Sequence, residues 1–367
     1  MGPLNYLDID RLSLVPEKYW SLHEFCFYLH DSLMEAASTY ELSGSHLVIE
    51  DIVQEIITEH HPNIEEFDLI ELLKDNELDE AYRQHIVGHT VLALLSDMHQ
   101  FLYSSLEAFE RRKFSVGFSL LRKVLKEHLV FLCWIVADET DFINRFEGDV
   151  YKTLNNLSKE KRIEIFDTSI EWIELTNMFD SNVLWSYIFD KNFSGGFEPV
   201  WQMATHLVTS QGIIKTKRYS LNFAFEDRSD DYYFELLYEK LPYLLIFLVQ
   251  VAMKSLSKTC EVDKKVVGRF IISTVGVYEA LCLTGKSHIA VLLRTFFKDF
   301  LHCMFCGEKI RLTKKKRPRL FVSQLIECQH CRVDNQFPLD WLMSKANLVV
   351  KENGDIDTLI TSKPRIA

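Results

Sequence analysis

Apolar residues recur at intervals of three and four along much of the chain, a spacing that places them on one face of an α-helix. Long packed helices are therefore predicted from about residue 70 to about residue 179. Two more helices are expected upstream, at 21–38 and 45–61. The segments that show the pattern most clearly are 82–109, 115–137 and 141–157. The fold class that follows is all-α, a helical bundle.

The periodic pattern weakens between residues 181 and 229, where turn residues and short aromatic stretches predict a loop-rich insertion. Helical periodicity returns at 231–258, where Pro242 is expected to bend or restart the helix, and continues to about residue 300. We therefore expect a helical body over 1–300, with 1–68 as an N-terminal subdomain.

The pattern changes again after residue 300. Strand-type residues in "IRLT" and "RLFVSQLI" flank the loop "KKKRP", which predicts a β-hairpin within a small unit at 301–338. The last segment, 339–367, predicts a short helix at "LDWLMSK" and a hairpin that turns at Asn353 and Gly354.

Four of the eight cysteines form two CxxC pairs separated by 21 residues. This spacing is typical of a zinc ribbon, because two tight turns can aim four thiolates at one tetrahedral ion. Four protein ligands leave no open position, so one structural zinc ion is expected, with disulfides as the alternative. The other four cysteines lie singly in apolar segments, which favours a reducing compartment. The predicted zinc ligands are Cys303, Cys306, Cys328 and Cys331.

Charge is distributed unevenly along the chain. The segment from Gly307 to Leu320 carries +6, whereas the rest of the chain carries −18. Such a local excess of cations suits contact with nucleic acid, since phosphate neutralisation depends on local cation density. The alternative is a solvated surface whose cations pair with acidic groups of the same protein. The candidate nucleic-acid-binding residues are Lys309, Arg311, Lys314, Lys315, Lys316, Arg317 and Arg319.

Composition and hydropathy indicate a soluble protein. Hydrophobic residues make up 47% of the chain and charged residues 26%, an ordinary globular composition. The first 20 residues lack the apolar stretch of a secretory signal, and the longest apolar runs are about half of what a bilayer-spanning helix needs. We expect a cytoplasmic location and no membrane contact.

Two constellations outside the cysteines could carry chemistry. His85 and His89 are four residues apart, the spacing with which a helix presents two imidazoles to one metal, but no third ligand is evident and a structural role is expected. Arg122 and His128 are the first and last residues of the stretch "RKVLKEH". Six residues at about 100° each would place these two side chains about 120° apart on a regular helix.

The stretch at 100–146, which contains "LLRKVLKEH", resembles the paired-helix core of HEPN-like helical proteins, including an uncharacterised prokaryotic branch. The segment "WQMATHLVTSQGI", with His206, resembles a later histidine-containing loop of that branch. The resemblance covers about 70–258. It implies a metal-independent ribonuclease at a dimer interface, with Arg122 holding the scissile phosphate and His128 or His206 transferring protons. Lys123 departs from the small polar residue usual after the arginine.

Three functions are therefore expected from the sequence. The leading one is an interaction protein whose ribbon contacts nucleic acid or a nucleic-acid-bound partner, while the helical body dimerises or binds a protein. The resemblance associates such an architecture with prokaryotic defence or mobile-element systems. The alternatives are the ribonuclease and a structural adaptor in which the ribbon caps the bundle.

Overall fold

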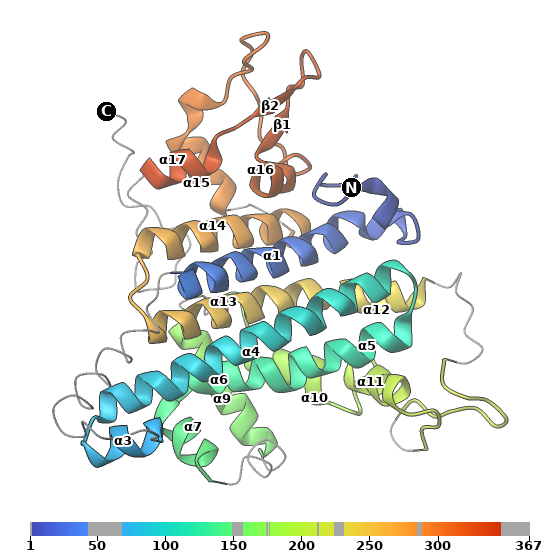
Figure 1. Ribbon diagram of the computed structural model, residues 1–367. Helices are drawn as coiled ribbons and strands as arrows, with labels where there is room; N and C mark the ends of the chain where they lie inside the picture. The colour runs from blue at the N-terminus through green and yellow to red at the C-terminus, as the bar shows by residue number, and fades with distance from the viewer. Residues whose placement is uncertain are drawn as a thin grey trace.

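The all-α prediction is confirmed in the computed structural model: helices dominate, and a single two-stranded sheet lies near the C-terminus of the described chain (Figure 1). The structure describes residues 2–42, 68–148, 157–173, 175, 177–210, 213–223, 231–284 and 288–345. The helix expected at 45–61 and the hairpin expected at Asn353 and Gly354 lie outside these residues.

The first half of the body is built from α1, a long α4 and the helices that pack against α4. Two 3-10 turns, Ile9–Leu12 and Glu17–Tyr19, lead into α1. The helices are α1 (Trp20–Leu42), α3 (Leu69–Asp75), α4 (Asp79–Glu110), α5 (Phe114–Lys123), α6 (Leu129–Ala137), α7 (Glu139–Phe146) and α9 (Lys159–Trp172).

The second half closes the bundle and leads to the ribbon. Its helices are α10 (Ser181–Phe189), α11 (Glu198–Thr205), α12 (Tyr232–Tyr238), α13 (Leu241–Thr259), α14 (Lys264–Leu281) and α15 (His288–Phe296). Pro242 lies in the first turn of α13, where a proline costs the helix no hydrogen bond, so the predicted restart of the helix is found. The segment expected to be loop-rich, 181–229, begins with α10 and α11, and its irregular part follows Thr205.

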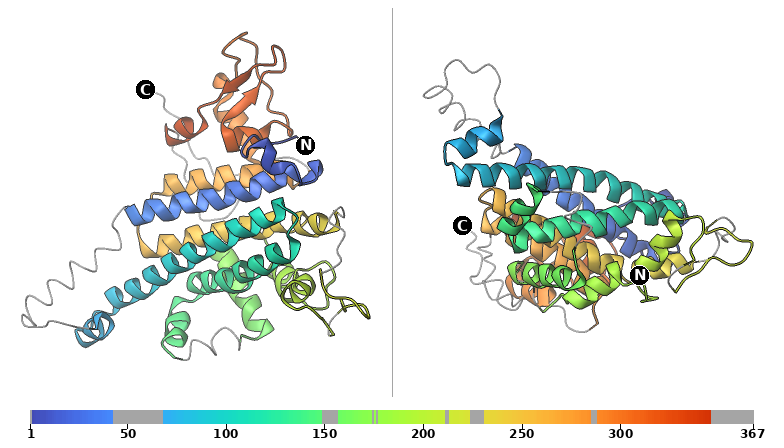
Figure 2. Two further views of the ribbon diagram at one scale, coloured as in Figure 1. Left: turned by 45° about the vertical axis from the view of Figure 1, so that its right-hand side comes forward. Right: turned by 90° about the horizontal axis from the view of Figure 1, so that it is seen from below.

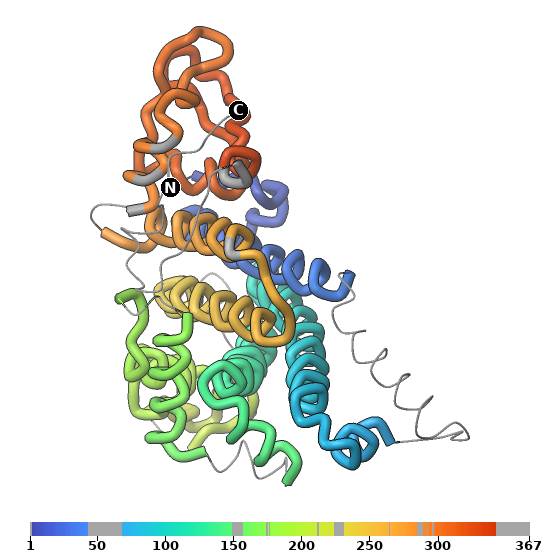
Figure 3. Tube along the Cα trace, turned by 90° about the vertical axis from the view of Figure 1, so that its left-hand side faces the viewer, coloured from blue at the N-terminus to red at the C-terminus, as the bar shows by residue number. Residues whose placement is uncertain are grey.

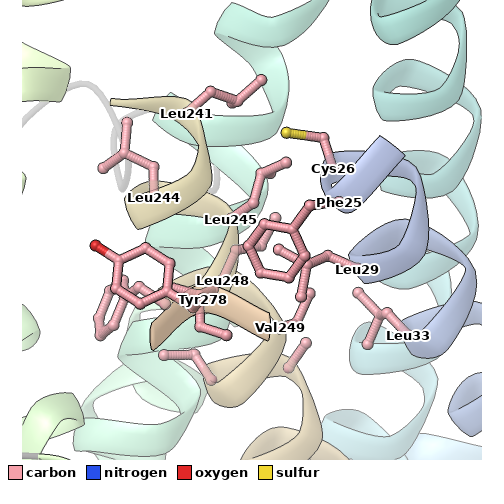
Figure 4. Packing of buried hydrophobic residues seen from close by; sticks show 14 of the residues in the cluster. Phe25, Cys26, Leu29, Leu33, Leu241, Leu244, Leu245, Leu248, Val249 and Tyr278 are labelled. Atoms are coloured by element: carbon pink, nitrogen blue, oxygen red, sulfur yellow. The ribbon is translucent and has the colours of Figure 1, made fainter. Parts of the chain in front are cut away.

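Helix α13 is the centre of the core and contacts α1, α4, α6 and α14. In Figure 4, Leu245, Leu248 and Val249 of α13 lie between Phe25 and Leu29 of α1 and Tyr278 of α14. The stretch Tyr232–Thr259 is long and apolar enough to cross a membrane, but 89% of its most apolar window is buried inside the fold. This burial identifies the stretch as part of the core of the helical body.

The C-terminal unit stands on α14 and α1, at one end of the molecule (Figures 2 and 3). It comprises a 3-10 turn at Lys298–Phe300, α16 (Arg317–Ser323), β1 (Leu325–Glu327), β2 (Asp334–Gln336) and α17 (Leu339–Lys345). The short helix predicted at "LDWLMSK" is confirmed as α17.

The prediction of a β-hairpin between the two cysteine pairs was wrong about which residues form strands. The residues "RLFVS" belong to α16, which begins with Pro318 in its first turn. Leu320 and Phe321 are buried, and α16 packs on α14. Tertiary packing has overridden the β-propensity of Phe321 and Val322. The sheet instead pairs β1 with β2 around the second CxxC, in the register Ile326 to Asn335.

Candidate metal centre and the residues around it

Each CxxC pair sits in a tight backbone turn, and the two turns share one hydrogen-bond pattern. In the first, the N–H of Cys303 donates to Glu308 O (2.8 Å) and the N–H of Gly307 donates to Cys303 O (2.9 Å). In the second, Cys328 N–H donates to Val333 O and Arg332 N–H donates to Cys328 O, both at 3.0 Å. The two turns are therefore repeats of one local design.

The residue after each CxxC lies in the left-handed region, with φ of 73° at Gly307 and 63° at Arg332. Glycine adopts this conformation without cost, whereas arginine is strained there. Buried Asn335 joins the two turns, because its Oδ1 accepts from Met304 N–H (2.8 Å) and its Nδ2 donates to Val333 O (2.9 Å). In the sequence, the glycine that follows the first CxxC indicates a left-handed residue at the end of that turn. The arginine that follows the second CxxC gives no such indication.

The four cysteine sulfurs form one compact cluster, all within 4.8 Å of one another. The Sγ atoms of Cys303 and Cys331 are 3.5 Å apart, and those of Cys306 and Cys328 are 3.7 Å apart. A tetrahedral ion with metal–sulfur bonds of about 2.3 Å has sulfur–sulfur edges of about 3.8 Å, whereas a disulfide is about 2.05 Å long. The cysteines are therefore free thiols arranged to hold one metal ion.

The four thiols differ in how readily they ionise: two have a lowered pKa and two have a raised pKa. Desolvation opposes ionisation of Cys303, but backbone N–H groups of Cys306 and Phe305 stabilise its thiolate and bring its pKa to about 6. The pKa of Cys306 is raised to about 12, because desolvation and the neighbouring sulfurs outweigh a favourable backbone hydrogen bond. The pKa of Cys328 is lowered and that of Cys331 is raised. A dication would allow all four to ionise together, as thiolate ligation requires.

The metal centre is attached to the body through α16 and α14. Phe321 lies against the backbone of α14 at Gly276, where an added Cβ would come within 2.5 Å of the ring. A groove of about 580 Å³ runs along this joint between α1, α14 and α16. Five carboxylates and one cation, Arg269, line it, so this side of the joint repels phosphate. The carboxylates are Asp31, Glu35, Glu261, Asp263 and Asp340.

The seven basic residues of the ribbon do not form one tip. Lys316 pairs with Glu327 (Nζ to Oε1, 3.2 Å), and Arg319 makes two hydrogen bonds to Asp334 at 2.8 and 2.9 Å. Lys314 donates to Leu283 O (2.5 Å), and burial lowers the pKa of Arg317, which is partly enclosed beside α14. Lys309, Arg311 and Lys315 are exposed, and none of the three has an ion pair with another described residue.

Two apolar side chains at the metal centre are unusually exposed. Met304 and Phe305, the central residues of the first CxxC, are 79% and 69% exposed. Gln329 of the second CxxC bonds to the backbone of both Lys309 and Arg311 (2.7 and 3.2 Å), so these two cations lie beside the second turn. We call Met304, Phe305, Lys309, Arg311 and exposed His330 the knuckle face. The exposure of Phe305 was not predicted from the sequence, although the position of this residue between two ligands is a signal for it.

Arg122 and His128 are not brought together. A π-helical turn at Val124–His128 joins α5 to α6, so the helix is continuous but has one wider turn. His128 is buried and its Nε2 lies 2.8 Å from Asp97 Oδ2 on α4, which also binds Lys123 (2.5 Å). Arg122 instead pairs loosely with Glu127, with Nη1 and Oε1 3.9 Å apart.

Three further histidines were candidates from the sequence: the pair His85 and His89, and His206. His85 and His89 stack with ring centroids 6.2 Å apart. Among the described residues, the cysteines are the one group of three or more side chains placed to hold a metal, so the two histidines lack a third ligand. His206 is exposed and lines a cavity beside α11.

Comparison with known proteins returned no matching family model, no matching curated protein and no matching solved structure. The HEPN-like resemblance therefore stays a prediction.

Proposed function

We propose that the protein binds single-stranded nucleic acid through the knuckle face, and that the four-thiolate centre holds a structural zinc ion that shapes this face. The donor set supports zinc, because four thiolates in a closed tetrahedral arrangement are typical of structural zinc sites. The metal would act on binding only through the geometry of the two turns.

The observation that carries the proposal is the exposed ring of Phe305 in the first metal turn, at a centre that also carries two exposed cations, Lys309 and Arg311, without an ion pair to another described residue. An apolar ring that is 69% exposed loses hydrophobic stabilisation unless something covers it. Aromatic rings next to lysine or arginine are the elements with which proteins hold single strands, since bases stack on the ring and phosphates contact the cations. The acidic groove at the joint with the body is unsuited to phosphate, which favours the knuckle face as the place where a strand would bind.

The test is a titration of labelled single-stranded RNA and DNA with zinc-loaded protein at two salt concentrations. The Lys309→Ala/Arg311→Ala variant should flatten the slope of log affinity against log salt by about 1.4, the effect of two lost phosphate contacts. Phe305→Ala should weaken binding about 5- to 100-fold with the slope unchanged. Lys113→Ala/Lys265→Ala removes two exposed cations from the body and is the matched control.

Unchanged affinity in both knuckle variants would overturn the proposal. Binding that falls equally in the control variant would show that the contact is a general effect of charge.

A second candidate, the structural adaptor, is favoured by the packing of Phe321 against Gly276. In this function the ribbon caps α14, and the cations of α16 serve the fold through Glu327 and Asp334. A ribbon that binds no nucleic acid but whose zinc raises the melting temperature of the body would favour it.

A further inference from the structure

A second surface with the chemistry of a phosphate site lies far from the ribbon, in the loop that follows α11. The described residues of the loop are 206–210 and 213–223, and they lie beside α11, away from the C-terminal unit (Figure 1). Thr216 Oγ1 donates to Asn222 Oδ1 (2.6 Å), and Asn222 Nδ2 donates to His206 O and to Thr209 Oγ1 (both 2.7 Å). These bonds tie the residues that directly follow α11 to the later part of the loop.

The loop is basic in an acidic chain. Residues 206–223 contain no aspartate or glutamate, although the whole chain has a net charge of −12. Lys215, Lys217 and Arg218 are exposed on it. His206 was a candidate from the sequence alone, whereas the absence of acidic residues is the additional signal that distinguishes this segment.

Tyr219 is the most unusual residue of the loop. Its side chain is 90% exposed, and its backbone φ of 62° lies in the left-handed region, which a bulky residue rarely adopts. The guanidinium carbon of Arg218 lies 4.9 Å from the ring centroid and covers part of the ring. A strained backbone that presents a largely exposed aromatic ring contributes little to packing, and such strain is concentrated at functional sites.

A cavity of about 360 Å³ lies between the loop and α11, a volume in the range of small-ligand sites. Six of its ten lining residues have polar side chains: Lys191, Glu198, Gln202, His206, Thr209 and Ser210. Lysine, histidine and hydroxyl groups are the donors that phosphate oxygens accept from.

The one carboxylate that lines the cavity, Glu198, is already neutralised. Lys126 Nζ lies 2.6 Å from its Oε2, and Gln202 Nε2 donates to its Oε1 (2.9 Å). Burial lowers the pKa of Lys126, and Arg122 and Arg162 lower it further, so cations outnumber carboxylates around Glu198. Arg122 thus contributes positive charge to this region.

We propose that the 206–223 loop and its cavity bind a nucleoside phosphate, with the phosphate held by Lys191 and His206 and the base stacked on Tyr219. The ligand can be a free nucleotide or a nucleotide of a single strand. The site is separate from the knuckle face and does not depend on the function proposed for it.

Binding can be measured by calorimetry with full-length, zinc-loaded protein and three probes: inorganic phosphate, AMP and a 5′-phosphorylated ten-nucleotide RNA. The key variant is Tyr219→Gly, which removes the ring and relieves the backbone strain, because glycine adopts a positive φ without steric cost. We expect at least a tenfold loss of AMP affinity in Tyr219→Gly, near-normal affinity in Tyr219→Phe, and at least a tenfold loss in Lys191→Ala.

The RNA arm is run in the Phe305→Ala background, which removes the ring of the knuckle face. AMP and RNA binding that both depend on Tyr219 would show that either source of the nucleotide is accepted, and RNA binding alone would assign the site to a strand. Phosphate binding unaffected by Tyr219→Gly, with no gain from the base in AMP, would overturn the stacking role. No binding of any probe, or binding indifferent to Lys191 and Tyr219, would overturn the proposal.

Discussion

The ribbon and the helical body are ordered by different means. In the body, α13 is buried on nearly all sides, and Leu244, Leu245 and Leu248 have no exposed surface. The ribbon has two strands of three residues and a helix of seven, too little secondary structure to form a stable core alone. The body spreads its stabilisation over many apolar contacts, whereas the ribbon combines a few buried apolar side chains with four thiols placed to hold one metal ion.

This difference predicts how each region fails. Loss of one body residue should lower the stability of the whole bundle by a few kcal/mol, whereas loss of one sulfur should disorder the ribbon and leave α13 in place. The joint between Gly276 and Phe321 is where the two regions can influence each other.

The largest effect is expected from Cys328→Ser. A structural zinc ion contributes about 10–16 kcal/mol of binding free energy to a small domain, and a hydroxyl is a poor substitute for a buried thiolate. Hydrogen exchange should show loss of protection at Cys303, Gly307 and Arg332 while α13 stays protected. Cys260→Ser, in the body, is the control and should keep the metal. A ribbon that stays protected in Cys328→Ser would contradict the account.

The next effect is expected at the joint. Gly276→Ala places a methyl group within 2.5 Å of the Phe321 ring, which should cost about 1–3 kcal/mol of unfolding free energy. Metal content should be unchanged, because no ligand moves. Combining it with Phe321→Leu should recover part of the loss, and an additive double variant would show that the contact is absent in solution.

The buried histidine His23 predicts a pH dependence of the stability of the body. His23 is fully buried between Glu110 (3.1 Å) and Tyr238, and burial lowers its pKa although Glu110 opposes this and Arg11 reinforces it. Below about pH 6.5 the unfolded chain therefore binds a proton that the folded chain rejects, and stability falls as pH falls. His23→Gln should reduce this slope between pH 6.5 and 5 by up to about 1.4 kcal/mol per pH unit. Denaturant unfolding at several pH values measures it, and an unchanged slope would refute the assignment.

The smallest effect compares the two metal turns. Gly307→Ala should cost about 1 kcal/mol, because no atom lies within 4 Å of an added Cβ and the cost is conformational alone. Arg332→Gly should be neutral or slightly stabilising, since relief of strain offsets the loss of an exposed ion pair with Glu327. Thermal unfolding of zinc-loaded protein measures both changes in stability. If Arg332→Gly destabilised the protein as much as Gly307→Ala does, the backbone of Arg332 would not be strained and the two turns would not be equivalent.

Of all the features of this protein, the metal site is the one that the sequence predicts best, because the geometry of a CxxC turn depends only on neighbouring residues. Helical periodicity likewise predicts α4, the α5–α6 helix and α13. The residues "RLFVS" were misassigned because their composition suits a strand, and only the contact with Gly276 on α14 decides for a helix. The separation of Arg122 from His128 follows from helix geometry, whereas the exposure of Phe305 and Tyr219 depends on backbone turns that no periodicity encodes.

The most direct test of the account is the metal content of the purified protein together with the number of its reactive thiols. We predict one zinc ion per chain, with Cys303, Cys306, Cys328 and Cys331 protected from a thiol reagent until a chelator is added. A chain without bound metal, or one in which these four cysteines form disulfides, would contradict it.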